Sequence, residues 1–139
     1  KNKTKKSILI FTSPASRKIA LEQPISYHLG KAMVDQIVRF YSLQLAKINC
    51  NINAISPAFV LKKRAEKFYK DNKKLTNLIN NIIPNGKMIN TEEFAKIVFN
   101  LMSENFYYIN GQIIDVDGGL NVHENASLSR LSMKVLDEF

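Results

Sequence analysis

The chain has 139 residues and a formal net charge of +8, with 45% apolar and 23% charged side chains. This composition excludes a disordered chain and fits one globular domain that buries roughly two thirds of its unfolded surface. No apolar run approaches the ~18 residues of a membrane-spanning helix, and the run after the basic start is too short for a secretory signal. We therefore expect a cytoplasmic protein that does not enter a membrane.

The cysteine and histidine content argues against a disulfide or a metal site. Cys50 is the single cysteine, and His28 and His123 lie far apart in the sequence, so no zinc-ligand set is expected. Cys50 is interpreted as a buried small hydrophobe. The positive charge is compatible with a phosphate-rich partner, but nucleic-acid binding requires that charge to gather on one face. Charge alone therefore selects no function.

The first third of the chain predicts a strand, a loop and a long helix. The continuous apolar run at residues 7–11 is typical of a strand buried on both faces of a parallel sheet. Residues 12–24 are polar and contain two prolines, which predicts a loop. From about residue 24 to residue 47, apolar side chains recur at spacings of three and four and predict a helix with one face on the core. These side chains are Met33, Val34, Ile37, Val38, Tyr41 and Leu45.

The middle of the chain predicts a second strand and more helices. Residues 50–56 suit a strand that stops at Pro57, because proline has no N–H to donate. Residues 61–83 are rich in lysine with apolar residues between, which predicts one or two short amphipathic helices over a site. Asn90 followed by Glu93 has the pattern of a capping box and predicts the start of another helix.

The last third predicts a third strand and a tail. Asn110 and Gly111 signal a turn, and residues 112–116 predict a third strand that ends at the Asp-Gly-Gly segment of residues 117–119. Strands that alternate with helices of this length give right-handed crossovers and a parallel sheet, so the predicted fold class is α/β. Residues 122–139 form a polar tail. Within it, Leu128, Leu131 and Val135 have the spacing of one face of a short helix.

Tyr27 and Lys31 are the first candidates for chemistry, because they are four positions apart, which places them on one face of the predicted helix. A phenol is about 0.1% ionised at pH 7, and a nearby cation can lower its pKa by ~1–3 units, into the range of general acid–base catalysis. Ser13, at the end of the first strand, can reach the same cavity and donate a hydrogen bond to a carbonyl oxygen. Thr12 competes for that role. Alone, this pair is more often a half-buried tyrosine beside a surface lysine.

Two further motifs follow in order, Ile-Asn-Ala-Ile-Ser-Pro-Ala-Phe-Val at residues 52–60 and Ile-Asn-Gly-Gln-Ile-Ile-Asp-Val-Asp-Gly-Gly at residues 109–119. With the Tyr-x-x-x-Lys pair, they make residues 7–121 resemble the short-chain dehydrogenase/reductase family, of the ketoacyl-carrier-protein reductase type. The resemblance implies the C-terminal half of a Rossmann-like, doubly wound parallel sheet, with about three parallel strands and flanking helices. Residues 1–121 would form the catalytic half, and residues 122–139 a tail.

The resemblance also implies roles for single residues. Ser13, Tyr27 and Lys31 carry over as the catalytic set: Tyr27 exchanges a proton with the carbonyl or alcohol oxygen, Lys31 lowers its pKa and binds the nicotinamide ribose, and Ser13 polarises the carbonyl. The hydride comes from NAD or NADP. The family's Asn-Ala-x-x-Pro-Gly segment carries over to Asn53, Ala54 and Pro57. Cofactor contacts are expected at Tyr27, Lys31, Pro57, Ala58 and Val60.

This sequence departs from the family pattern in three places. Ala58 stands where glycine is common, and Lys62 stands where a threonine often contacts the nicotinamide. The interval from Ser13 to Tyr27 is about one residue longer than usual, which an insertion near Arg17 can absorb. Ala58 is tolerated if its φ is negative, whereas Lys62 puts one cofactor contact in doubt.

The glycine-rich turn of a dinucleotide site is missing from this sequence, because none of its five glycines follows an N-terminal strand and opens a helix. The family's catalytic asparagine would also lie before Lys1. We therefore expect a catalytic half that is inactive alone. Its first strand would become an exposed apolar edge, which predicts an obligate dimer or an aggregation-prone chain. The family's association through the helix that carries Tyr27 also implies a homo-oligomer.

Other interpretations stay open. The basic run from Lys62 to Lys74 is usually a solvated face, but it corresponds to the family's substrate lid and would then favour an anionic or carrier-linked carbonyl or alcohol substrate. His28 is interpreted as a helix residue beside the site, and Asp115 with Asp117 offers too few oxygens for calcium. The alternative functions are a non-catalytic oligomerisation partner and a basic nucleic-acid-binding module. The ordered motifs favour a reductase with no nucleic-acid partner.

Overall fold

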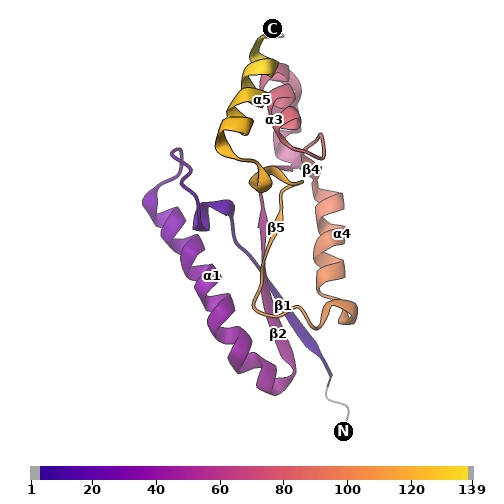
Figure 1. The fold of residues 1–139 in the computed structure, drawn as a ribbon. Coiled ribbons are helices and arrows are strands. Elements are labelled where there is room, and N and C mark those ends of the chain that lie inside the picture. Colours follow the sequence, from indigo (N-terminus) through magenta and orange to yellow (C-terminus); the bar gives the residue numbers. More distant parts are fainter. Residues whose placement is uncertain (1–3, 138–139) are drawn as a thin grey trace. The chain divides into compact units, whose positions relative to one another are not determined.

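The computed structural model describes residues 4–137, with side chains for residues 4–134. The basic start at Lys1–Lys3 and the expected helical position Val135 lie outside the described residues and side chains. The elements are β1 (Lys6–Phe11), α1 (Ile25–Leu45), β2 (Cys50–Pro57), β3 (Val60–Leu61), α2 (Glu66–Asp71), α3 (Lys73–Ile82), β4 (Ile89–Asn90), α4 (Thr91–Leu101), β5 (Ile113–Val116) and α5 (Asn125–Asp137) (Figure 1).

The chain divides into two compact units. The first runs to Ala58 and resumes over Ala95–Val116, and the second comprises Phe59–Phe94 and the chain from Asp117 onward. All the strands of the larger sheet belong to the first unit, whereas β3, β4, α2, α3 and α5 belong to the second.

The first unit is a three-stranded parallel sheet with the strand order β1-β2-β5. β2 is the central strand, so both of its faces are buried from Cys50 to Ser56. α1 packs along β2 and buries Val38 against it, and Figure 1 shows α1 running beside the sheet. The core consists of Val38, Ile52 and Ala54, with Ile10, Leu45 and Ile113 packed around them. The predicted α/β class with about three parallel strands is confirmed.

β1 lies at the edge of this sheet. We expected its apolar run to be buried on both faces, but Ile8 is 39% exposed and Phe11 47% exposed. The expectation of burial on both faces is wrong because no other strand among the described residues pairs with the outer side of β1. The predicted apolar edge is present.

The second unit contains the lysine-rich segment and a short parallel pair, β3 with β4. Ile79, Ile83 and Met88 form its core, and α3 packs against both α2 and α5. The predicted capping box at the start of α4 is confirmed: the Glu93 backbone N–H donates to Asn90 Oδ1 at 2.8 Å, and the Asn90 N–H donates to Glu93 Oε2 at 3.2 Å. Two-residue strands such as β3 and β4 are too short to be found from sequence periodicity.

No helix within residues 4–137 is both long enough and apolar enough to cross a membrane.

Candidate active site

Ser13 sits in the turn that follows the carboxyl end of β1. It caps a 3-10 helix, Pro14–Ser16, and its Oγ accepts a hydrogen bond of 3.2 Å from the Ala15 N–H. A hydroxyl donates one proton and accepts on its lone pairs, so this contact orients Ser13 and leaves its proton able to bond a further acceptor. The geometry suits a donor to a carbonyl oxygen.

Tyr27 and Lys31 lie on the first two turns of α1, on one face, as predicted. Lys31 Nζ is 5.7 Å from the centroid of the Tyr27 ring. The same ammonium donates a hydrogen bond of 3.0 Å to the Phe11 carbonyl oxygen, two residues before Ser13. Tyr27 is 38% exposed, so solvent or a substrate can reach its ring. Lys31 therefore links the tyrosine to the end of the strand that leads to Ser13.

Thr12 is the alternative to Ser13 as the hydroxyl donor, but its side chain already forms another hydrogen bond. Its side chain is buried, and its Oγ1 lies 2.5 Å from Asp35 Oδ1 and 3.4 Å from the Lys31 carbonyl oxygen. A threonine hydroxyl has one proton, and Asp35 is the closer acceptor. This geometry favours the half-buried Ser13 as the hydroxyl that can face a substrate.

Asp35 is a buried residue near the site that no sequence motif singled out. It is 2% exposed and lies one helical turn beyond Lys31, on the face of α1 that covers the sheet. The available signal was an acidic residue four positions after Lys31 within an apolar helix face, where a charge is costly to bury without a partner. Thr12 supplies that partner.

Arg17 fastens the turn after β1 to the other two strands. Its Nη2 lies 2.5 Å from Asp115 Oδ1 on β5 and 3.5 Å from the Oγ of Ser56, the buried serine near the end of β2. The sequence predicts a loop at Arg17 and a strand at Asp115, but no local pattern indicates that the two residues meet. The carboxyl ends of all three strands are thus joined around the Ser13 turn.

The expected cofactor residues begin at the end of β2. Pro57 is the last residue of β2, and the Ala58 N–H donates a hydrogen bond of 3.3 Å to the Val116 carbonyl oxygen. Asn49 is the only non-glycine residue with a positive φ among the described residues, so Ala58 has a backbone that alanine adopts without strain. Val60 begins β3 in the second unit, and Lys62 is exposed.

Asp117 is a turn residue in this structure. Its Oδ1 accepts from the Gly119 N–H at 2.9 Å and its Oδ2 from the Asn121 N–H at 2.7 Å, while Gly118 has a φ of +62°. Within the described residues no three side chains of histidine, cysteine, aspartate or glutamate gather in a way that can hold a metal ion.

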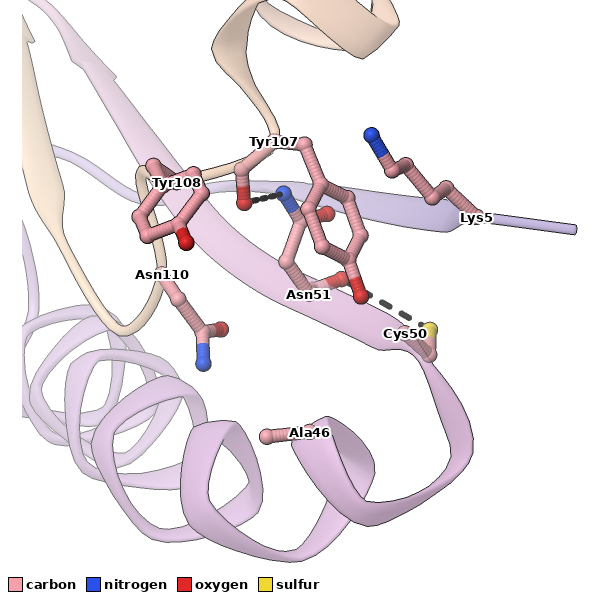
Figure 2. A pocket seen from close by; sticks show the side chains of 7 residues that line it. All are labelled: Lys5, Ala46, Cys50, Asn51, Tyr107, Tyr108 and Asn110. Carbon is pink, nitrogen blue, oxygen red and sulfur yellow. Dashed lines mark hydrogen bonds between the residues drawn. The ribbon is translucent and has the colours of Figure 1, made fainter. Parts of the chain in front are cut away.

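A separate cavity of about 410 Å³ lies at the amino-terminal ends of β1 and β2 (Figure 2). Asn51 lines it and donates from Nδ2 to the carbonyl oxygens of Tyr107 and Ile109, both at 3.1 Å. Ser13 follows the opposite end of β1, so this cavity contains none of the predicted site residues. Its lining comprises Lys5, Ala46, Cys50, Asn51, Tyr107, Tyr108 and Asn110. Cys50 is buried, as predicted.

Together, the three-stranded parallel sheet and the helix packed along it define a Rossmann-like α/β unit. Residues 1–121 match a family model described as enoyl-(acyl carrier protein) reductase. The chain belongs to the short-chain dehydrogenase/reductase family.

Individual relatives agree with this family. The chain is 30% identical to a tropinone reductase homologue of Arabidopsis thaliana over 116 residues, which cover 84% of this chain and 44% of the relative. It is 32% identical to the 3-oxoacyl-(acyl-carrier-protein) reductase of Thermotoga maritima over 95 residues, covering 68% of this chain and 37% of that protein. The chain thus spans less than half the length of these relatives.

Solved structures show the same fold. A short-chain dehydrogenase/reductase of Caenorhabditis elegans, solved with cofactor, has a TM-score of 0.70 and 26% identity, and the match covers 88% of this chain and 48% of that one. A putative 2-deoxy-D-gluconate 3-dehydrogenase of Agrobacterium tumefaciens, solved with NADP, has a TM-score of 0.73 at 24% identity, with coverage of 86% and 48%.

Proposed function

We propose that this chain supplies the catalytic half of an NAD(P)-dependent oxidoreductase that interconverts a carbonyl and an alcohol. The observation that carries the proposal is the position of Lys31 Nζ, 5.7 Å from the Tyr27 ring centroid and hydrogen-bonded to Phe11 at the end of β1. This contact places an ammonium, a phenol and the Ser13 turn in one neighbourhood. Membership of the family supports the same assignment.

Each of the three residues has a defined role in this proposal. Tyr27 gives a proton to the carbonyl oxygen during reduction and removes it from the alcohol during oxidation. The Lys31 charge stabilises the ionised phenol, and Ser13 donates a hydrogen bond to the same oxygen, which gains negative charge as the hydride arrives. The nicotinamide cofactor supplies or accepts that hydride when it is bound.

The residues present fit the nicotinamide side of such a cofactor. An ammonium has three donors, and Lys31 directs one to Phe11, so another can bond a ribose hydroxyl. Pro57 and Ala58 would contact the nicotinamide, together with Tyr27 and Lys31. The pyrophosphate side has no counterpart in this sequence, because no glycine-rich turn opens a helix after a strand. The proposal therefore expects activity only when a dinucleotide-binding half is also present.

The lysine-rich segment suggests the substrate class. Lys62, Lys63 and Arg64 are exposed side chains at the start of the second unit's helical region, and Lys63 Nζ is 3.6 Å from a Glu92 carboxylate oxygen. Their net positive charge favours an anionic or carrier-linked substrate. Reversing the charge of all three residues in the active assembly should raise KM for such a substrate with little change in kcat. An unchanged KM would contradict this part of the proposal.

The first experiment is a calorimetric titration of NADH and NADPH into the 139-residue chain at moderate salt. The proposal expects no binding to the chain alone, and micromolar binding would contradict the requirement for a complementary half. The second experiment uses the assembly with a dinucleotide-binding half. There, Tyr27→Phe should lower turnover by roughly 10²–10⁴-fold and leave cofactor affinity nearly unchanged. Retained turnover would remove Tyr27 from the catalytic role.

A further inference from the structure

His28, the residue after Tyr27, has hydrogen bonds at both of its ring nitrogens. It is 7% exposed. Nδ1 lies 3.1 Å from the Pro24 carbonyl oxygen, and Nε2 lies 3.0 Å from the Ala20 backbone nitrogen. One imidazole thus joins two points of the loop of residues 18–24, which connects the Ser13 turn to α1.

These two contacts fix one form of the ring. A carbonyl oxygen can only accept, so Nδ1 must carry the proton that bonds Pro24. A backbone N–H can only donate, so Nε2 must be the unprotonated acceptor for Ala20. His28 is therefore the neutral Nδ1–H tautomer, and no carbon ring of the same size can make either bond.

The bond to Pro24 lies where α1 begins. Pro24 is the residue before the first turn of α1, and no side chain caps that turn. The Pro24 carbonyl oxygen accepts from the Tyr27 N–H at 3.0 Å as well as from His28. The same carbonyl oxygen thus accepts one hydrogen bond from the His28 ring and one from the backbone of Tyr27.

The loop itself has little packing to hold it. Ile19 is 73% exposed and Leu21 is 93% exposed, so these apolar side chains bury little surface. Within the loop, the Gln23 N–H donates to the Ala20 carbonyl oxygen at 3.0 Å. Arg17, the residue before this loop, forms an ion pair with Asp115. His28 forms hydrogen bonds with Ala20 and Pro24 inside the loop, so the loop is held at both ends.

We propose that His28 is a positioning residue that fixes the loop of residues 18–24 and, through Pro24, the first turn of α1 that carries Tyr27. This inference rests on the proposed function, because it is the acid–base role of Tyr27 that makes its position matter. This loop lies between Ser13 and Tyr27 in the sequence, and the hydrogen bonds of His28 determine the path of the chain between these two residues.

Three substitutions separate the hydrogen bonds from simple packing. His28→Gln can place an acceptor oxygen near the Nε2 position, His28→Asn can place a donor near the Nδ1 position, and His28→Phe keeps the ring volume without either bond. In the full 139-residue chain, amide exchange of Ala20 should rise roughly tenfold in the Asn and Phe variants, the ratio for one lost hydrogen bond. The Gln variant should retain most of the protection.

The ring form of His28 is tested without any substitution. Nitrogen-15 spectra of the labelled imidazole in the unmodified chain at neutral pH should show a protonated Nδ1 and an unprotonated Nε2. An Nε2–H tautomer, or free exchange between the two tautomers, would overturn the proposal. This measurement holds even if a His28 variant fails to fold.

The kinetic test uses the active assembly with its dinucleotide-binding half. His28→Phe, which makes neither hydrogen bond, should lower kcat and kcat/KM by the same factor, whereas His28→Asn and His28→Gln, which each keep one of the two bonds, should lower them less. If His28→Phe has the same kcat and kcat/KM as the unmodified enzyme, the positioning role is overturned. Tyr27→Phe is the matched control: it should lower turnover by the roughly 10²–10⁴-fold expected above and leave Ala20 protection unchanged, so failure of the proposed chemistry and failure of the His28 proposal give different results.

Discussion

At the scale of single residues, the buried Thr12–Asp35 pair connects the end of β1 to the helix that carries Tyr27 and Lys31. Asp35 Oδ1 accepts from Thr12, and Asp35 Oδ2 is buried with no hydrogen-bond partner in the described part of the chain. The hydrogen bond from Thr12 is therefore important for Asp35, because burying an acceptor without a hydrogen bond lowers the stability of the fold. The pair therefore contributes to both stability and site geometry.

Thr12→Val should destabilise the chain by about 1–3 kcal/mol, because it leaves Asp35 buried without a hydrogen bond. Thr12→Ser keeps the hydroxyl and is the matched control. Urea unfolding followed by circular dichroism measures both variants. If the valine and serine variants unfold at the same urea concentration, the contact makes no net contribution.

The glycine after Asp117 offers a second test at this scale. Gly118 has a φ of +62°, and an added Cβ would lie 2.7 Å from Ile83 Cγ2. Gly86 has a φ of +78° with nothing within 4 Å of the added atom, so it isolates the backbone effect. Gly86→Ala should cost about 1–2 kcal/mol, and Gly118→Ala should cost more because of the added contact. If thermal unfolding shows the same loss of stability for Gly86→Ala and Gly118→Ala, Ile83 moves away from the added Cβ at no cost in free energy.

At the scale of elements, α5 begins at a glutamate cap. Glu124 Oε1 accepts from the Ala126 N–H and Oε2 from the Ser127 N–H, both at 2.9 Å. These backbone hydrogen bonds, that of Ala126 first, lower the pKa of Glu124 below its ordinary value. The cap suits the positive end of the helix dipole, and α5 in turn packs against α3.

The lowered pKa predicts how the start of α5 responds to acid. A carboxylate whose folded-state pKa is depressed stabilises the fold above its unfolded pKa, and that stabilisation is lost as pH falls through the folded value. Amide protection of Ala126 and Ser127 should therefore stay constant from neutral pH down to the ordinary glutamate range and fall below it. Glu124→Gln should remove this pH dependence. An acid response that persists in the glutamine variant would assign it to another group.

At the scale of the whole molecule, two surfaces leave apolar side chains exposed. No strand within residues 4–137 pairs with the outer edge of β1, and α1 carries a stripe of exposed residues at helical spacing that includes Leu29, Met33 and Phe40, each about 60% exposed. Exposed apolar strand edges and patches are sites of association. Self-association of this chain remains a prediction, and light scattering at micromolar concentration tests it. A stable monomer would contradict it.

Backbone geometry allows the contribution of the β1 edge to be isolated. The N–H groups of Lys6 and Thr12 point to β2, so the N–H groups of the residues at odd positions between them point to the open edge. Leu9→Pro should weaken association through the edge and keep the β1–β2 ladder, whereas Ile10→Pro should disrupt the ladder and the fold. Met33→Lys tests the helix surface. If Leu9→Pro leaves the association constant unchanged, the edge is not the contact.

The sequence by itself determined the α/β class, the three parallel strands, the long helix and the capping box at Asn90, because hydrophobic period, proline and cap residues are local signals. It also placed Tyr27 and Lys31 on one helix face, since their spacing alone decides that. The roles of these residues and of Ser13 remain predictions.

Only the tertiary structure decided which distant residues meet. The partners of Thr12, Arg17 and His28 depend on how the loop and the strand ends come together, and no local pattern encodes those contacts. The exposed position of β1 was likewise a matter of pairing, because an apolar run has the same sequence whether or not a neighbouring strand covers it.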